Sequence, residues 1–243
     1  MNLIKLDDID STNDFLKDLS RKQVVENFLT VVAQTQTKGK GQMGSIWDSE
    51  SGKNLIMSTL VKDVLKDIDQ IFHLNVAVAL SVIHVLESYN LPKLSIKWPN
   101  DIMSDTKKLG GILIENSFKS DNTIESVVGI GLNVNQNKFD KLPKASSMTL
   151  VMNKEYDLET IWQEIIFQIK RNCSLILSNQ SPKIWDDYHK CLFKINAPMP
   201  FEDSDKSRFM GIIQGVSSEG MLEVMLEDDT VKTYGIKEIQ MLY

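Results

Sequence analysis

Apolar residues recur at helical spacing in three stretches of the chain. The first stretch begins at Ser11, whose S-T-N-D sequence is typical of a helix N-cap, and the predicted helix ends near Arg21. The second covers residues 68–89, ahead of Pro92, and is the longest predicted helix of the first half. The third covers residues 157–177. Aromatic residues in and after the third helix are expected in the core: Trp162, Phe167 and Trp185.

Short apolar or alternating runs between turn sequences predict strands over residues 27–34, 54–61, 94–98, 110–116 and 126–135. We expect them to contribute to one mixed sheet. After Cys191 the chain changes to short strands separated by the turn sequences E-D-S-D-K-S, S-S-E-G and E-D-D-T, which predicts a small β-barrel of about 50 residues. The predicted fold class is α+β, in two domains of residues 1–190 and 191–243.

Composition narrows the class of protein. The chain has 243 residues, 42% hydrophobic and 25% charged, as in ordinary globular proteins, and this excludes a disordered or collagen-like chain. Its acidic first residues lack the basic start and apolar run of a signal peptide, and no apolar run approaches the ~18 residues of a membrane span. Cys173 and Cys191 fit a reduced protein better than a disulfide framework. We therefore expect a cytoplasmic protein without a membrane partner.

Charge bears on the ligands that the chain can hold. Lys and Arg number 27 against 33 Asp and Glu, a formal net charge of −6, so a nucleic-acid partner is not expected. The only arginines are Arg21, Arg171 and Arg208. An anion site must therefore depend mostly on lysine ammonium groups and backbone amides.

Gly39, Gly41 and Gly44 have the G-x-G-x-x-G spacing of a dinucleotide-binding fingerprint. That fingerprint needs a helix to begin among the glycines, whereas here a turn leads into another strand, so we do not expect a Rossmann site. The loop also carries Lys38 and Lys40. Taken alone, it is equally consistent with a cradle for a carboxylate or phosphate and with a mobile surface loop.

Two further segments carry candidate chemistry. In K-W-P-N-D, residues 97–101, Pro99 ends a strand and leaves Asn100 and Asp101 at its tip, with Lys107 and Lys108 at the start of the next strand. A hairpin with a solvated basic start explains the same residues. In G-I-G-L-N-V-N, residues 129–135, glycines on one strand face leave room for a ligand or for a packing neighbour.

The three segments together are more specific than any one of them. The motifs occur in the order S-T-N, then Q-T-K-G-K-G-Q-M-G-S-I-W, then K-W-P-N-D with K-K-L-G-G-I-L-I-E, then G-I-G-L-N-V-N. In this order the chain resembles the biotin protein ligases, the biotin–[acetyl-CoA-carboxylase] ligases. The resemblance covers essentially the whole chain. It implies a mixed-sheet catalytic domain of the biotin/lipoate ligase type followed by an SH3-like domain. Only ten residues precede Ser11, so we expect the monofunctional type without a DNA-binding domain.

The resemblance implies a reaction in two steps. The carboxylate of biotin attacks the α-phosphorus of ATP, giving biotinyl-5′-AMP and pyrophosphate, with Mg²⁺ on the phosphates. A lysine of a biotin carboxyl carrier protein then attacks the mixed anhydride and releases AMP. No enzyme nucleophile is needed, and the sequence offers no convincing Ser–His–Asp or Cys–His set. Monomer and homodimer both remain open.

The resemblance also implies residue roles. Lys108 would bridge the biotin carboxylate and the α-phosphate, Lys40 would hold the acyl-phosphate region, and Asp101 would orient or deprotonate the incoming lysine. The expected biotin-binding residues are Ser11, Thr12, Asn13, Gln36, Gly39, Lys40, Gly111, Gly129 and Gly131. The expected ATP- and adenylate-binding residues are Gly41, Gln42, Trp47, Lys97, Asn100, Lys108 and Asn133.

The glycine-rich loop departs from the family pattern. It reads G-K-G-Q-M-G-S where G-R-G-R-R-G-R is familiar, so bidentate phosphate contacts are lost. This predicts weaker retention of biotinyl-adenylate than in arginine-rich members. A lipoate or other acyl ligase of the same fold, and a non-catalytic biotin-binding module, are the alternatives.

Overall fold

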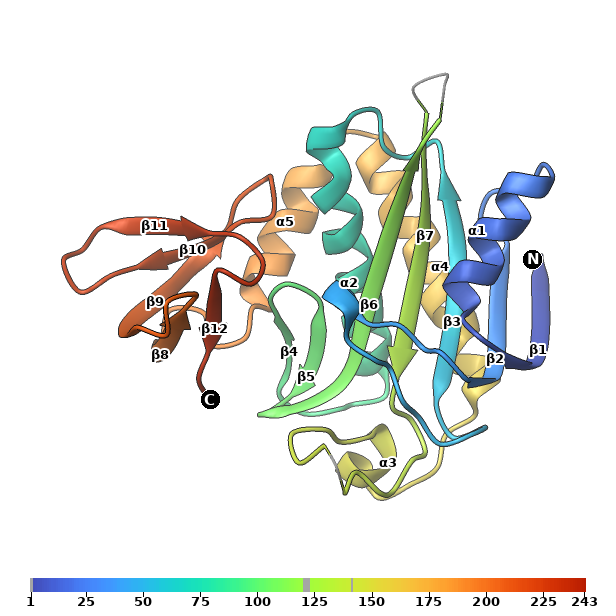
Figure 1. Ribbon diagram of the computed structural model, residues 1–243, viewed down its shortest axis with the longest axis horizontal. Helices are drawn as coiled ribbons and strands as arrows, with labels where there is room; N and C mark the ends of the chain where they lie inside the picture. The colour runs from blue at the N-terminus through green and yellow to red at the C-terminus, as the bar shows by residue number, and fades with distance from the viewer. Residues whose placement is uncertain (1, 120–122, 141) are drawn as a thin grey trace.

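The computed structural model describes residues 2–119, 123–140 and 142–243, which form two sheets and the helices packed on them (Figure 1). The seven-stranded sheet has the order β1-β2-β3-β7-β6-β5-β4, and the five-stranded sheet has the order β11-β10-β9-β8-β12. In the larger sheet β1 and β2 are parallel and the other pairs are antiparallel. The predicted α+β class and mixed sheet are therefore confirmed.

The larger sheet consists of β1 (Leu3–Ile9), β2 (Thr30–Gln36), β3 (Leu55–Lys62), β4 (Leu94–Lys97), β5 (Asp101–Ser104), β6 (Lys107–Phe118) and β7 (Ile124–Leu132). The helices are α1 (Thr12–Lys22), α2 (Ile71–Ser88), α3 (Met148–Met152), α4 (Leu158–Leu177) and α5 (Ser181–Lys190), with 3₁₀ turns η1 (Gln42–Gly44) and η2 (Ile68–Gln70). The smaller sheet consists of β8 (Pro198–Asp203), β9 (Arg208–Val216), β10 (Leu222–Met225), β11 (Val231–Tyr234) and β12 (Ile239–Met241).

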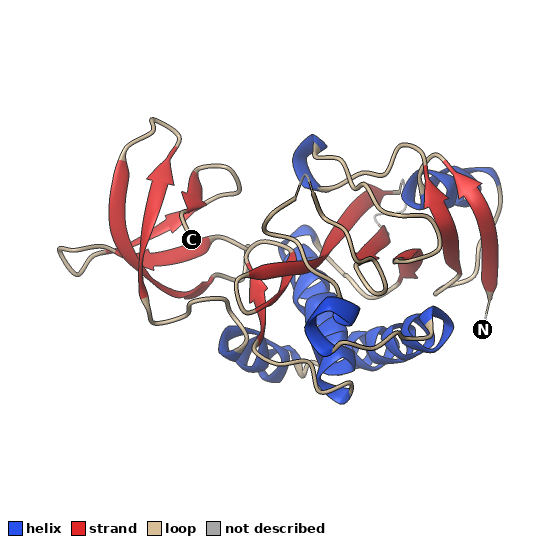
Figure 2. Cartoon of the chain, turned by 90° about the horizontal axis from the view of Figure 1, so that it is seen from below, coloured by secondary structure: helices blue, strands red, loops and turns tan. Residues whose placement is uncertain are grey.

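Helices cover one face of the larger sheet, and α1 covers part of the other (Figure 2). The stretch 68–88 is long and apolar enough to cross a membrane, but it is mostly buried, and α2 packs against α4 and α5 as the central helix of the core. On the opposite face, Leu16 of α1 packs with Val31, Leu60 and Val127 of the sheet in a second apolar cluster. Strand β3 is buried along almost its whole length because both of its faces are covered.

The predicted helix cap at the start of α1 is confirmed. The Ser11 hydroxyl accepts a hydrogen bond from the Asp14 N–H at 3.4 Å, and Ser11 adopts the extended backbone of an N-cap. Buried Leu16 anchors the helix to the sheet. The S-T-N segment is thereby held against the middle of β3 and β7.

Strand register places three glycines of β6 and β7 on the same part of the sheet. Gly111 of β6 is opposite Gly131 of β7, and Leu113 is opposite Gly129. Asp101 of β5 is in turn opposite Gly111. The carboxylate of K-W-P-N-D therefore lies next to a strip of the sheet that carries few side chains.

The smaller sheet is continuous with the core of the larger one. Its buried side chains, among them Phe201, Val224 and Met241, belong to the same apolar cluster as those of α2 and α4. The Trp98 indole donates a hydrogen bond to the Gly220 carbonyl at 2.9 Å, and the Ile96 N–H donates to the Cys191 carbonyl at 2.7 Å. The K-W-P-N-D turn is thus fixed directly to the second sheet.

Some elements were not predicted, and one core expectation is wrong. Strands β1 and β5 and helices α3 and α5 have no counterpart among the predicted elements. Trp162 is buried as expected, whereas the Phe167 side chain is 67% exposed. The buried residues of α4 lie on one face, and Phe167 points away from it. Cys173 is buried and Cys191 is half-buried, and both are free thiols.

Candidate active site

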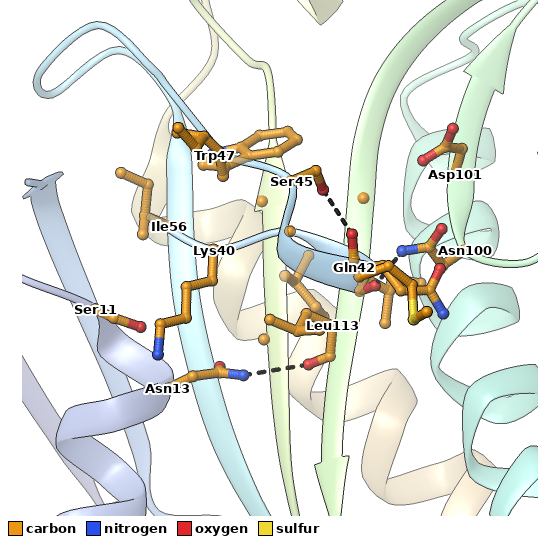
Figure 3. A pocket seen from close by; sticks show the side chains of 18 of the residues that line it. Ser11, Asn13, Lys40, Gln42, Ser45, Trp47, Ile56, Asn100, Asp101 and Leu113 are labelled. Atoms are coloured by element: carbon orange, nitrogen blue, oxygen red, sulfur yellow. Dashed lines mark hydrogen bonds between the residues drawn. The ribbon is translucent and has the colours of Figure 1, made fainter. Parts of the chain in front are cut away.

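A cavity of about 380 Å³ lies between the glycine-rich loop and the glycine strip of the larger sheet (Figure 3). One end is formed by the start of α1, the middle by β3, β6 and β7, and the other end by the turn at 99–101. In Figure 3, Ser11 and Asn13 lie at the first end and Asn100 and Asp101 at the second. Segments that are far apart in sequence therefore enclose one elongated space.

Apart from Lys40, the first end of the cavity is lined by polar, uncharged groups. The Gln36 carbonyl Oε1 accepts hydrogen bonds from the Thr12 N–H at 2.8 Å and from the Thr12 hydroxyl at 3.0 Å. The Ser58 hydroxyl lies 2.7 Å from the Thr12 hydroxyl and 2.6 Å from Asn13 Oδ1. Oε1 of Gln36 already accepts these two hydrogen bonds, and the amide Nε2 is the donor that Gln36 can offer to a ligand.

A partly buried ion pair behind this end fixes the Asn13 side chain. Asn13 Nδ2 donates to a Glu115 carboxylate oxygen at 2.8 Å, and Lys17 Nζ contacts the other oxygen at 2.6 Å. Burial lowers the pKa of Lys17, but the adjacent carboxylates of Glu115 and Asp14 outweigh it and hold that pKa above its usual value. Glu115 and Lys17 were not singled out from the sequence, although Glu115 ends the K-K-L-G-G-I-L-I-E motif.

Two of the glycines make room for neighbouring side chains. A Cβ on Gly129 would lie 2.4 Å from Asn13 Oδ1, and one on Gly131 would lie 2.4 Å from the Trp47 ring. Trp47 comes from the glycine-rich loop, and its buried Nε1 has no hydrogen-bond partner among the described residues. The loop is therefore closed, with its tryptophan resting on the bare backbone of β7.

The second end of the cavity is charged. Lys108 Nζ contacts Asp101 Oδ1 at 2.5 Å, and Lys97 Nζ lies 3.6 Å from Asp101 Oδ2. Lys108 also lies 5.9 Å from the centre of the Trp47 ring. Burial lowers the pKa of Lys97, and the like charges of Lys108 and Lys144 lower it further against the opposing effect of Asp101.

Lys40 points toward α1 and away from Lys108. Its Nζ forms an ion pair with Asp14 at 2.6 Å, and Figure 3 shows the side chain directed toward Ser11 and Asn13. Burial raises the pKa of Asp14, but the ion pairs with Lys40 and Lys17 outweigh it and lower that pKa overall. The structure thus places the two expected catalytic lysines at opposite ends of the cavity.

Most of the expected site residues share this cavity, and three lie outside its lining. Asn133 is buried, and its amide donates to the Ser146 carbonyl at 3.0 Å. Lys97 lines an adjoining hollow that faces the smaller sheet, and a Cβ on Gly39 would meet the Trp47 carbonyl oxygen at 2.2 Å. The expected residues that line the cavity are Ser11, Thr12, Asn13, Gln36, Lys40, Gly41, Gln42, Trp47, Asn100, Asp101, Lys108, Gly111, Gly129 and Gly131.

The smaller sheet contributes residues that local sequence did not indicate. Ile236 and Lys237, from the turn between β11 and β12, line the cavity. Lys237 Nζ lies 3.5 Å from the Met43 carbonyl of the loop. No motif connects these two segments, because they are separated by almost the whole chain.

The arrangement fits a ligand with a neutral polar head, an apolar body and an anionic tail. The first end supplies amides and hydroxyls, Ile56, Met57 and Leu113 supply an apolar middle, and Lys108 supplies a cation at the second end. Among the described residues, no group of three or more His, Cys, Asp or Glu could hold a metal ion.

Comparison with known proteins agrees with this geometry. The Biotin/lipoate A/B protein ligase family matches residues 6–135. The chain is 28% identical over 241 residues to the bifunctional ligase/repressor BirA of Bacillus spizizenii, covering 96% of this chain and 72% of that protein. It is 25% identical over 197 residues to the biotin–[acetyl-CoA-carboxylase] ligase of Mycobacterium tuberculosis, covering 80% and 72% of the two chains.

A solved structure extends the likeness through both sheets. The biotin protein ligase from Aquifex aeolicus in complex with biotin and ATP superposes with a TM-score of 0.81 at 25% identity, covering 99% of this chain and 98% of that one. The family match includes every motif from S-T-N to G-I-G-L-N-V-N. The chain therefore belongs to the biotin/lipoate A/B protein ligase family, within its branch of biotin protein ligases.

Proposed function

We propose that this protein attaches biotin to a lysine of a biotin carboxyl carrier protein, with ATP as the energy source and biotinyl-5′-AMP as the intermediate. One observation carries the proposal. A single cavity joins the neutral hydrogen-bonding end at Thr12 and Gln36 to the Lys108–Asp101 pair at the other end. Biotin has the matching order of groups: a neutral ureido ring, an apolar chain and a carboxylate.

In the first step, a carboxylate oxygen of biotin attacks the α-phosphorus of ATP and pyrophosphate leaves. Two anions about 4 Å apart repel by about 4 kcal/mol at an effective dielectric constant of about 20, so a cation must lie between them. The position of Lys108, at the junction of the apolar middle and the charged end, supports this role for it. We assign it the stabilisation of the charge that develops in the transition state.

In the second step, the amine of the carrier lysine attacks the acyl carbon of the mixed anhydride, AMP leaves and the amine loses a proton. We assign Asp101 the orientation of that amine or the acceptance of its proton. The carboxylate is within ion-pair distance of both Lys97 and Lys108. Release of Lys108 toward the phosphate during the first step would leave Asp101 available to the incoming amine.

We assign Lys40 and the loop amides to the acyl-phosphate group, with Gln42, Trp47, Asn100 and Lys97 on the nucleotide side. For Lys40 this role requires its side chain to leave Asp14 when ATP binds. The G-K-G-Q-M-G-S loop presents no arginine, so we expect weaker retention of the adenylate than in arginine-rich relatives.

We infer that Mg²⁺ enters with ATP as part of the substrate, since Asp101 is the only carboxylate among the described lining residues of the cavity.

We infer a cytoplasmic enzyme of two domains, residues 1–190 and an SH3-like domain of residues 191–243. The end of α5 at Lys190 and the five antiparallel strands that follow support this division.

Substrate specificity tests the proposal. We expect pyrophosphate release from ATP that depends on biotin and is at least 100-fold slower with lipoate, because lipoate lacks a ureido group to pair with Gln36 and Thr12. Faster release with lipoate would favour a lipoate ligase of the same fold. Biotin binding with no release of pyrophosphate would favour a non-catalytic binding module.

A further inference from the structure

Tyr243 connects the smaller sheet to two lysines of the larger unit. Its ring centre lies 4.0 Å from Lys144 Nζ and 5.4 Å from Lys97 Nζ. The Phe193 ring packs edge-on against it, with 5.1 Å between the centroids. The neighbouring Leu242 N–H donates to the Pro200 carbonyl of β8 at 3.0 Å, so the segment that carries Tyr243 is fixed to the smaller sheet.

Both lysines are direct neighbours of the Lys108–Asp101 pair. Lys97 Nζ lies 3.6 Å from Asp101 Oδ2. The Lys144 carbonyl accepts a hydrogen bond from the Lys108 N–H at 2.7 Å, and the Lys108 carbonyl accepts one from the Ser146 N–H at 2.9 Å. Tyr243 therefore contacts one residue that holds the Asp101 side chain and one that holds the Lys108 backbone.

The charges around the ring explain why an aromatic side chain suits this position. The positive charges of Lys108 and Lys144 both act on Lys97, and Asp101 is the carboxylate that Lys97 and Lys108 share. The face of an aromatic ring attracts an ammonium group electrostatically, and the attraction strengthens where water is excluded. An aliphatic side chain of similar size would fill the space without attracting Lys97. It would leave Lys144 only its hydrogen bond to the backbone carbonyl of residue 243, which Lys144 Nζ makes at 2.5 Å.

We propose that Tyr243 is a positioning residue for adenylation, which holds Lys97 and Lys144 against their mutual repulsion and so fixes the geometry of the Lys108–Asp101 pair. The proposal rests on the function proposed above. Tyr243 acts on the charged end of the cavity, while the residues assigned to the biotin ring lie at the other end. Its loss should therefore affect the use of ATP and leave biotin binding unchanged.

Three substitutions separate ring electrostatics from packing: Tyr243→Phe, Tyr243→Leu and Tyr243→Ala. We expect the KM for ATP in adenylation to stay within about 2-fold of wild type for Phe and to rise about 10-fold for Leu and Ala. The Kd for biotin should not change in any of them. Tyr156→Leu is the matched control, because Tyr156 is also half-buried, with Lys154 Nζ 5.0 Å from its ring centre, and it lies outside the cavity lining.

A wild-type KM for ATP in Tyr243→Leu would overturn the proposal, since the ring would then contribute only packing. Equal weakening of biotin and ATP in Tyr243→Ala would also overturn it, because that pattern indicates general loosening of the fold. If wild type releases no pyrophosphate, the proposed function fails. The Tyr243 proposal is then decided by calorimetric Kd values for ATP, which should be about 10-fold higher in Leu than in Phe.

Discussion

Lys97 is the residue whose environment most clearly separates it from an ordinary surface lysine. It lies partly buried among Asp101, Lys108 and Lys144, and burial is the main cause of its lowered pKa. An ammonium with a lowered pKa loses its proton at a lower pH than usual. If its charge supports the binding of the ATP phosphates, activity should fall as the pH rises through that lowered pKa.

Lys97→Arg tests this account of the pH dependence. A guanidinium stays protonated at all accessible pH values, so we expect the alkaline limb of kcat/KM for ATP to move to higher pH in the variant. The first half-reaction should be measured alone, because the carrier lysine then does not titrate in the assay. An alkaline limb that is the same in both proteins would show that another group controls it.

Glu115 tests the other end of the cavity. Its carboxylate accepts a hydrogen bond from Asn13 Nδ2 and forms an ion pair with Lys17 Nζ. This orients the Asn13 amide so that its Oδ1 faces Ser58 and Gly129. In Glu115→Ala the Asn13 amide loses this constraint, and we expect about 10-fold weaker biotin binding with an unchanged KM for ATP.

Asn116→Ala is the matched control for Glu115→Ala. Asn116 is the adjacent residue on β6, and its side chain accepts a hydrogen bond from Ser126 instead. Titration calorimetry with biotin measures both variants. An unchanged Kd in Glu115→Ala, or an equal loss in Asn116→Ala, would contradict the role given to Glu115.

At the scale of elements, we expect the glycine-rich loop to set how long the biotinyl-adenylate intermediate stays bound. The loop is closed by Trp47 over Gly131 and by the Lys40–Asp14 pair, and its sequence G-K-G-Q-M-G-S contains no arginine. We expect the double variant Lys40→Arg, Gln42→Arg to release biotinyl-5′-AMP roughly 10-fold more slowly, because two guanidinium forks then face the adenylate. Stopped-flow measurement of the off-rate checks this. Equal or faster release from the variant would show that the loop composition does not limit retention.

Elements with a strong local signal were predicted from the sequence, and elements fixed by tertiary contacts were not. The S-T-N-D sequence at Ser11 correctly predicted where the first helix begins, because the helix cap is a local hydrogen bond. Strand β1 was missed because Asp7 and Asp8 interrupt its apolar pattern at the sheet edge. Phe167 is aromatic and was expected in the core, but it lies on the face of α4 opposite the buried residues.

The same distinction applies to the site. Motif residues such as Gln36, Asp101 and Lys108 could be predicted to share one site, and they line one cavity. Lys237 and Tyr243 could not, because their contacts with Met43 and Lys97 depend on how the second sheet docks. That docking has no periodic or short-range signature in the sequence.

At the scale of the whole molecule, the two sheets share one apolar cluster and several hydrogen bonds. The cluster runs from α2 and α4 into β9 and β10, and Trp98 bonds to Gly220 across the boundary. We therefore expect the slowest-exchanging amides of β7 and β9 to open with the same free energy in native-state hydrogen exchange. Earlier opening of β9 would show that the smaller sheet unfolds separately.

The most direct test of the proposed function is ATP- and biotin-dependent release of pyrophosphate, with and without a biotin carboxyl carrier domain, in wild type and Lys108→Ala. We predict release that requires biotin, rises to multiple turnovers when the carrier is added, and falls about 10²- to 10³-fold in the variant. Release of pyrophosphate at the wild-type rate by Lys108→Ala, or release that does not require biotin, would contradict the account.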